Sequence, residues 1–265
     1  METTDDLNMS LKDNSEGAPY DKLGAGHTAT RRPDPRIAAQ IHQALGDAHS
    51  IANVGAGTGM YEPYDRMVLP IATSQRRIAQ RAPELERAII GHAESLPLAS
   101  GSVDAAMALL TLHQWADWRV GVQELRRVAR KRVVILTYDR SYTERFWLLR
   151  DYLPKLGQLM CARLPEIEQQ CAAAGEEVRI DPVPVPHDCV DGCSIAAYWR
   201  RPSAYLDEDL RSGIPSFQLR GAERLLGGLD RLAEDLRSGN WAERNSDILE
   251  CPELDLGYRL LVCEL

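Results

Sequence analysis

The residues with the clearest capacity for chemistry are three alternating glycines, Gly55, Gly57 and Gly59, which follow the apolar stretch 50–54. Gly55 permits a sharp turn at the end of a strand, Gly57 lets the backbone approach a ligand with no Cβ atom in the way, and Gly59 allows close packing against a sheet. Free backbone amides at the start of a helix favour a carboxylate or polarised hydroxyls. The pattern predicts a ligand-binding turn between a buried strand and a helix that begins at Met60.

The spacing of these glycines restricts the ligand class. G-x-G-x-G is one residue tighter than the G-x-G-x-x-G pattern of dinucleotide sites, and no Gly-Lys-Ser/Thr follows, as a phosphate loop would require. A nucleoside ligand without a pyrophosphate fits this turn better than NAD or ATP. A tight structural turn that binds nothing is the alternative.

The six cysteines all lie in the second half of the chain. His187, Cys189 and Cys193 have the spacing H-x-C-x-x-x-C, which lacks a second well-spaced pair of ligands. We therefore predict no metal site and expect small core side chains plus a loop histidine. In a cytosolic chain of this length, the cysteines are expected to be reduced.

The elements that must position the glycine turn alternate along the first half of the chain. Apolar stretches alternate with amphipathic ones, a pattern that indicates a parallel, doubly wound α/β sheet with its ligand at the carboxyl ends of the strands. A final strand is expected to pair antiparallel with the strand at 177–183. The predicted strands are 50–54, 67–71, 88–91, 103–110, 132–137, 177–183 and 256–263. The predicted helices are 35–45, 74–81, 120–129, 143–156, 158–174, 194–206 and 220–237.

The domain organisation follows from composition. Residues 1–17 are polar and are predicted to form a disordered tail, and residues 18–265 a single domain. Residues 18–46 are expected to form a flexible, partly basic N-terminal lid and a helix. Residues 184–255 are too many for a hairpin connection, so they are expected to form a cap insertion over the open end of the sheet.

Charge and hydropathy exclude several classes of partner. The 265 residues carry a formal net charge of −8, which argues against non-specific binding to nucleic acid. The basic run 126–132 is interpreted as the solvated face of a helix. No apolar run approaches the ~18 residues of a membrane span, and the N-terminus lacks the features of a signal peptide. We expect a cytoplasmic protein that binds neither a membrane nor nucleic acid, as a monomer or homodimer.

Five stretches in register carry a family resemblance, and their order and spacing match from about Tyr20 to Thr137. The chain resembles the class I S-adenosylmethionine-dependent methyltransferases, in particular the bacterial, methyltransferase type 11-like branch that acts on small molecules. The resemblance implies a Rossmann-like, seven-stranded doubly wound sheet in the order 3-2-1-4-5-7-6, with the last strand antiparallel, and a helical cap insertion. The matching stretches are 54–59, 93–98, 102–105, 110–115 and 124–130.

The resemblance also implies S-adenosylmethionine as the cofactor and assigns residues to its parts. The glycine turn would contact the methionine and ribose portions, the segment after the third strand would border the adenine, and the end of the fourth strand would line the methionine. Two residues of the lid would close over the cofactor. The glycine-turn residues are Gly55, Ala56, Gly57 and Gly59, and the residues beside the adenine are His92, Ala93 and Glu94. The residues beside the methionine are Leu110 and Leu112, and the lid residues are Tyr20 and Arg31.

One position departs from the family pattern. The family places Asp or Glu at the end of the second strand, where it accepts hydrogen bonds from both ribose hydroxyls, and this chain has Ala72 there. Two charge-assisted hydrogen bonds of roughly 1.5–3 kcal/mol each are missing. Thr73, Ser74 and Glu62 are the candidates to compensate.

His113 is the best candidate for a general base, because it follows the fourth strand at the open end of the sheet. Its alternative role is packing beside Trp115. His187 is the second candidate, with a non-catalytic loop histidine as the alternative. Three aromatic residues at helical spacing either line an apolar acceptor pocket or pack in the core: Tyr198, Trp199 and Tyr205.

The sequence thus favours a small-molecule methyltransferase of bacterial specialised metabolism. Two alternatives stay open. The pocket can serve a non-methylating reaction such as a cyclisation or rearrangement, which Ala72 suggests, or the protein can be a non-catalytic ligand-binding protein.

Overall fold

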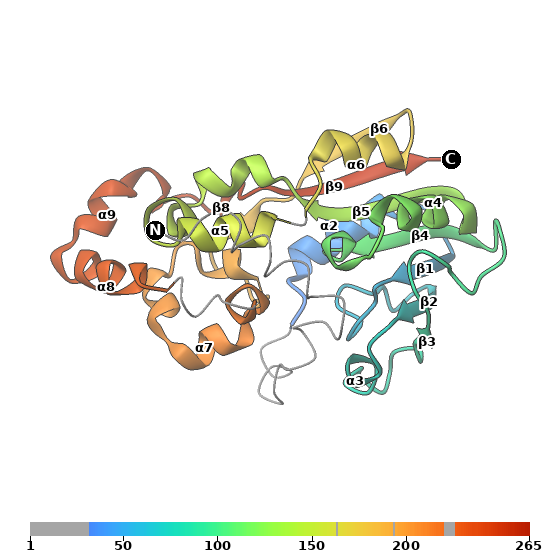
Figure 1. Cartoon of the computed structure of the whole chain (residues 1–265), viewed down its shortest axis with the longest axis horizontal. Coiled ribbons are helices and arrows are strands. Elements are labelled where there is room, and N and C mark those ends of the chain that lie inside the picture. The colour runs from blue at the N-terminus through green and yellow to red at the C-terminus, as the bar shows by residue number, and fades with distance from the viewer. Residues whose placement is uncertain (1–31, 163, 193, 220–225) are drawn as a thin grey trace.

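A seven-stranded sheet organises the protein, in the order β3-β2-β1-β4-β5-β9-β6 (Figure 1). The computed structural model describes residues 32–162, 164–192, 194–219 and 226–265. Strands β1 to β5 pair in parallel, and β9 pairs antiparallel with both β5 and β6. The strands are β1 (Ser50–Val54), β2 (Met67–Ala72), β3 (Ile89–Ile90), β4 (Val103–Leu109), β5 (Ala129–Tyr138), β6 (Val178–Pro182) and β9 (Tyr258–Glu264). The predicted strand order and the antiparallel last strand are confirmed.

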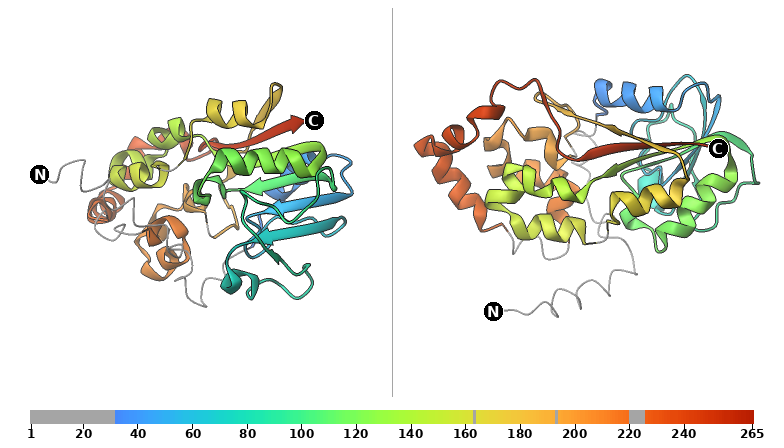
Figure 2. Two further views of the ribbon diagram at one scale, coloured as in Figure 1. Left: turned by 45° about the vertical axis from the view of Figure 1, so that its right-hand side comes forward. Right: turned by 90° about the horizontal axis from the view of Figure 1, so that it is seen from above.

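Helices cover both faces of this sheet, and others gather beyond the carboxyl ends of its parallel strands (Figures 1 and 2). The α-helices are α2 (Pro35–Ala44), α3 (Gln75–Ile78), α4 (Trp118–Val128), α5 (Pro154–Cys161), α6 (Ile167–Ala174), α7 (Glu208–Gly213), α8 (Gly228–Ser238) and α9 (Asn240–Arg244). The 3-10 helices are η3 (Leu112–Gln114), η4 (Arg140–Arg145), η6 (Ile195–Tyr198), η7 (Pro202–Leu206), η8 (Pro215–Gln218) and η10 (Ser246–Ile248). A π-helix, η5 (Leu148–Tyr152), and a small sheet of β7 (Val185–Pro186) and β8 (Glu253–Leu254) complete these elements.

The alternation of side chains along β4 explains why the sheet has two apolar faces. Ala105 and Met107 belong to the core cluster that includes Ile41 of α2. Ala106 and Ala108 belong to the cluster that includes Leu125 of α4. Figure 2 shows α2 on one side of the sheet and α4 with α6 on the other. A strand buried on both faces reads as a continuous apolar run, which is what the sequence has at this position.

The helix expected from Met60 is absent, and this prediction was wrong. Residues 60–66 form turns and bends, and Tyr61 has a left-handed backbone with φ +63°. Pro63 lacks the amide hydrogen that a helix would use, and Glu62 is held by partners outside the segment, described below. The glycine turn therefore leads into an irregular loop, so no helix N-terminus faces the predicted ligand.

The region after β5 is also less regular than expected. The predicted helix 143–156 is divided among η4, the π-helix η5 and the start of α5, and the predicted helix 158–174 is broken before α6 by Pro165. Pro202 likewise divides the predicted helix 194–206 into η6 and η7. Of the predicted helix 220–237, residues 220–225 lie outside the described residues, and α8 begins at Gly228.

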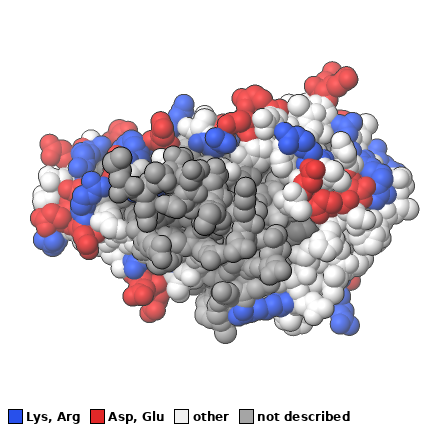
Figure 3. Space-filling model, in the orientation of Figure 1, with Lys and Arg blue, Asp and Glu red and all other residues white. Residues whose placement is uncertain are grey.

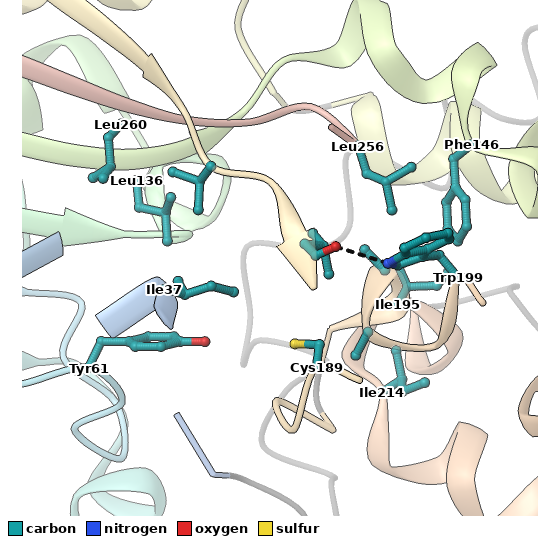
Figure 4. Close-up of a cluster of buried hydrophobic side chains, with 14 of the residues drawn as sticks. Ile37, Tyr61, Leu136, Phe146, Cys189, Ile195, Trp199, Ile214, Leu256 and Leu260 are labelled. Carbon is teal, nitrogen blue, oxygen red and sulfur yellow. Dashed lines mark hydrogen bonds between the residues drawn. The ribbon is translucent and has the colours of Figure 1, made fainter. Parts of the chain in front are cut away.

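An aromatic core holds these helices together, and Figure 4 shows its residues Phe146 and Trp199. Trp147, Trp199 and Tyr205 are almost fully buried. Trp147 donates its indole hydrogen to the carbonyl oxygen of Trp199 at 2.8 Å, and Trp199 donates to Val185 at 3.0 Å. Tyr205 donates to the carbonyl oxygen of Ile195 at 2.6 Å. Trp199 and Tyr205 therefore pack in the core, which was one of their two expected roles.

Candidate cofactor site

The glycine turn lies at the carboxyl end of β1 and is fixed to β2. The amides of Gly55 and Ala56 both donate to the carbonyl oxygen of Ile71, at 2.9 and 3.0 Å. All three glycines have left-handed backbones, with φ of +79° at Gly55, +51° at Gly57 and +88° at Gly59. Residues other than glycine rarely adopt this conformation. The turn therefore requires glycine for its backbone shape alone.

The atoms around each glycine show which glycines are needed for packing and which one faces space for a ligand. A Cβ atom on Gly55 would lie 2.3 Å from Thr111 Oγ1, and one on Gly59 would lie 2.4 Å from Leu85 Cδ1. At Gly57 the nearest atom among the residues that the structure describes would be Arg77 Nη1, at 3.7 Å. Gly55 and Gly59 are thus needed for internal packing, whereas Gly57 presents a face that a ligand can approach.

The end of β2, beside this turn, carries no carboxylate. Ala72 is buried, and its carbonyl oxygen accepts a hydrogen bond from Gly91 at 3.2 Å. Pro70 is tolerated within β2 because β3 pairs only with Ile71 and Ala72 and does not reach it. Ser74 caps α3 by accepting a hydrogen bond from the amide of Arg77 at 3.3 Å.

Glu62 is the nearest buried acid, but it is committed to other partners. Arg81 Nη2 lies 2.6 Å from Glu62 Oε2, and the two side chains are 4% and 1% exposed. Asn53 of β1 donates to Glu62 Oε1 at 2.8 Å. Arg81 also donates to the carbonyl oxygen of Gly57 at 3.4 Å. This network supports the glycine turn from inside, so Glu62 is not available to accept from a ribose without breaking it.

The ends of β3 and β4 supply the other residues predicted to contact a cofactor. Ala93 is buried and His92 is exposed, and Glu94 accepts a hydrogen bond from the amide of Asp117 at 3.1 Å. Leu110 has a left-handed backbone with φ +51°, and Leu112 is buried. Because β1 pairs with both β2 and β4, the structure brings the glycine turn, Ala72 and the end of β4 to one edge of the sheet. Their contacts with a cofactor remain a prediction, and Tyr20 and Arg31 lie outside the described residues.

The two candidate general bases occupy different settings. His113 lies in η3, directly after β4, and is partly exposed beside Gln114, whose amide nitrogen is 3.5 Å from its ring. Trp115 instead packs against α4, where a Cβ atom on Gly121 would lie 2.3 Å from its ring. His187 extends from β7, with Nδ1 3.0 Å from the carbonyl oxygen of Pro252. His113 is therefore the better placed of the two, and its role as a base remains a prediction.

A buried junction beside the turn was missed by the sequence analysis. Tyr61 donates to Asp191 Oδ2 at 2.7 Å, and both residues are buried. Burial and the negative charge of Asp191 raise the pKa of Tyr61, so the phenol stays protonated. Figure 4 shows Tyr61 directed towards Cys189, whose thiol pKa burial raises to about 12. An aromatic residue two positions after the glycine pattern was the only local signal, because its partner is 130 residues away.

Residues 188–190, which precede Asp191, contact the start of α2. Asp34, fully buried, accepts from the amide of Val190 at 3.2 Å and pairs with Arg36 at 2.8 Å. Arg36 also pairs with Asp188 at 2.7 Å. Burial alone would raise the pKa of Asp34, but the hydrogen bonds from Arg36 and Val190 outweigh it and lower that pKa to about 2.

The basic run 126–132 is held by internal partners. Arg127 pairs with Glu124, Arg130 with Asp104 at 2.9 Å and Lys131 with Asp47 at 3.1 Å. Figure 3 shows basic and acidic side chains interspersed over the described residues of the face in view. Within the described residues, no helix is long and apolar enough to cross a membrane, and no group of His, Cys, Asp or Glu side chains is arranged to hold a metal. Cys193 lies outside those residues.

Comparisons with known proteins agree with this geometry. The methyltransferase domain family matches residues 52–137. A protein named as a methyltransferase from an antibiotic biosynthesis pathway of Anabaena variabilis is 33% identical, with a TM-score of 0.80 over 89% of this chain and 99% of that chain. No curated protein sequence matches.

More distant structures are similar as well. The geranyl diphosphate C-methyltransferase of Streptomyces coelicolor is 15% identical, with a TM-score of 0.48 over 86% of this chain and 74% of that chain. The [4+2]-cyclase SpnF is 18% identical, with a TM-score of 0.47 over 86% of this chain and 79% of that chain. The extended similarity to the Anabaena protein, together with the match over the glycine turn, decides the family. The chain belongs to the class I S-adenosylmethionine-dependent methyltransferases, with a methyltransferase type 11 domain over residues 52–137.

Proposed function

We propose that this protein transfers the methyl group of S-adenosylmethionine to a small molecule in bacterial specialised metabolism. The open face of Gly57 carries this proposal, because a left-handed glycine at the carboxyl end of β1, with no atom of the described residues closer than 3.7 Å to its Cβ position, offers room for a bound ligand. The antibiotic biosynthesis pathway named for the Anabaena relative supports the type of metabolism.

The glycine turn at the edge of the sheet fits the cofactor, whereas Ala72 lacks the acid that would bind its ribose. The turn accepts the close approach of a methionine and ribose, and Asn53, Glu62 and Arg81 hold it in shape. The buried Ala72 provides no acceptor for the ribose hydroxyls. The cofactor supplies a sulfonium-activated methyl group. The protein then needs to align an acceptor with that methyl group and, for a hydroxyl or acidic carbon, to take up a proton, for which His113 is the proposed base.

A second candidate is a non-methylating reaction in the same pocket. The absence of a carboxylate at Ala72, together with the commitment of Glu62 to Arg81, favours it. A cyclisation or rearrangement needs a shaped pocket, and a bound nucleoside can remain there without being consumed. This candidate shares the glycine turn with the first and differs in whether the methyl group leaves the cofactor.

Calorimetry with S-adenosylmethionine and S-adenosylhomocysteine tests whether the turn binds the cofactor. The informative variant is Gly57→Asn, because Asn tolerates a left-handed backbone while its side chain fills the ligand face. The matched control is Gly239→Asn, at a glycine with φ +82° and no atom of the described part of the chain within 4 Å of its Cβ position. We expect Gly57→Asn to abolish binding and Gly239→Asn to preserve it. Equal binding by both variants would place the cofactor elsewhere.

Formation of S-adenosylhomocysteine separates the two candidate reactions. A methyltransferase produces one molecule of it for each acceptor molecule that it converts. An acceptor converted with no loss of S-adenosylmethionine would show that the pocket serves the non-methylating reaction.

A further inference from the structure

Tyr61 has a strained backbone at the same edge of the sheet as the glycine turn. Among the described residues other than glycine, only Tyr61 and Leu110 have left-handed backbones, with φ of +63° and +51°. Tyr61 follows the turn at the end of β1, and Leu110 directly follows the neighbouring strand β4. A left-handed backbone costs free energy in a residue other than glycine, and it persists where surrounding contacts enforce it, which is most common at functional sites.

The contacts of the neighbouring Glu62 join Tyr61 to the glycine turn. The amide of Glu62 donates to the carbonyl oxygen of Gly59 at 3.2 Å. Its carboxylate pairs with Arg81, which also donates to the carbonyl oxygen of Gly57 at 3.4 Å. These bonds close a ring that runs along the chain from Gly57 to Glu62 and back through Arg81. A ligand that fixes Gly57 therefore restricts the backbone at Tyr61 as well.

The hydroxyl of Tyr61 contacts a different part of the chain, within the predicted cap insertion. It donates to Asp191 at 2.7 Å, and both residues are buried. Segment 188–191 leads through η6 and η7 to α7, which lies beyond the carboxyl ends of the parallel strands (Figure 1). In a sheet of this kind the ligands bind at those ends. The Tyr61 hydroxyl thus connects the loop after the glycine turn to the region where an acceptor would approach.

We propose that Tyr61 is a positioning residue, which transmits the occupancy of the glycine turn to segment 188–191. This inference rests on the proposed cofactor site at the glycine turn. A ligand on Gly57 keeps Tyr61 in its left-handed conformation, in which its hydroxyl reaches Asp191. Segment 188–191 then opens less often, and the helices that follow it stay in place. The bound nucleoside therefore shapes the region that receives the acceptor.

Hydrogen–deuterium exchange of segment 188–191, with and without S-adenosylhomocysteine, tests this inference. The amide of Val190 donates to the buried Asp34 at 3.2 Å, so its exchange requires the segment to open. If opening also requires the ligand to leave, the ligand slows exchange by about 100-fold at a concentration of about 100 times its Kd. Because opening can occur in part without release of the ligand, we expect a slowing of at least about tenfold in the wild type.

Tyr61→Phe removes the hydroxyl that joins the loop to segment 188–191, while the buried ion pair still supports the turn. At the same multiple of the variant's own Kd, the ligand should then slow exchange less than about twofold. The matched control is Tyr258→Phe, at a residue of β9 whose hydroxyl lies 2.8 Å from Ser194 Oγ, just beyond the segment. It should keep the slowing seen in the wild type, because a hydroxyl with a merely structural role changes exchange in both states alike.

Two substitutions of Asp191 change the acceptor of this hydrogen bond instead of the donor. Asp191→Ala should also abolish the slowing, whereas Asp191→Asn keeps an amide oxygen that can accept from Tyr61 and should retain part of it. Equal slowing in the wild type, Tyr61→Phe and Asp191→Ala overturns the role of Tyr61. Exchange in the wild type that the bound ligand leaves unchanged overturns it as well.

The outcomes distinguish this inference from the proposed function. Either of the last two results leaves the proposed function intact, because calorimetry still detects the ligand at the turn. Failure of the wild type to bind S-adenosylhomocysteine overturns the proposed function and this inference together.

Discussion

Replacing Arg81 with methionine tests whether the buried Arg81–Glu62 pair supports the glycine turn. The two charges lie 2.6 Å apart, and their side chains are 4% and 1% exposed, so water cannot replace the lost partner. Removing one member of a buried ion pair costs about 3–5 kcal/mol, because the other charge is left uncompensated. Since a domain is stable by about 5–15 kcal/mol, Arg81→Met should remove a large share of the free energy of unfolding.

The expected loss can be assigned to the charge by a double-mutant cycle in urea. Glu62→Gln combined with Arg81→Met leaves no buried charge, so the double variant should be more stable than Arg81→Met alone by about 1–3 kcal/mol. Arg237→Met is the matched control, because Arg237 and its partner Glu234 are 70% and 61% exposed and such pairs contribute at most about 1 kcal/mol.

A second measurement links this pair to the ligand. Arg81 also donates to the carbonyl oxygen of Gly57, so its loss should weaken binding of S-adenosylhomocysteine in the residual folded protein. Two results together would show that the pair does not support the glycine turn. Arg81→Met would lower the free energy of unfolding no more than Arg237→Met, and the double variant would be no more stable than Arg81→Met.

Three further changes have defined outcomes. Ala72→Glu should bind S-adenosylhomocysteine about tenfold tighter by calorimetry; an unchanged affinity would contradict the assignment of Ala72 to the ribose edge. Asp34 has its pKa lowered from 3.8 to about 2, so it contributes about 2 kcal/mol above pH 4 that is lost as the pH falls towards 2. The difference in unfolding free energy between wild type and Asp34→Asn should shrink over that range. A constant difference would contradict this contribution of the Asp34 carboxylate. Tyr61→Phe should cost about 1–3 kcal/mol by removing a hydrogen bond to the buried, charged Asp191, whereas Tyr64→Phe, at a residue 75% exposed, should cost nothing measurable in urea.

The parallel strands could be located because their signals are local, whereas their order in the sheet was implied by the family resemblance. Each parallel strand is an apolar run between turn residues, and the chain needs no distant partner to reveal it. The glycine turn was equally visible, since left-handed backbones at Gly55, Gly57 and Gly59 restrict those positions to glycine. The boundary between α4 and β5 was shifted by three residues, as β5 begins at Ala129, because a basic segment continues from the helix into the strand.

The departures from prediction arise from contacts between distant residues. The helix expected at Met60 does not form because Glu62 pairs with Arg81 instead. Arg81 lies 19 residues further along the chain. Once Glu62 is drawn into the interior, Tyr61 takes a left-handed backbone and reaches Asp191. Neither partner is identifiable from spacing, so the loop and its buried network appear only in three dimensions.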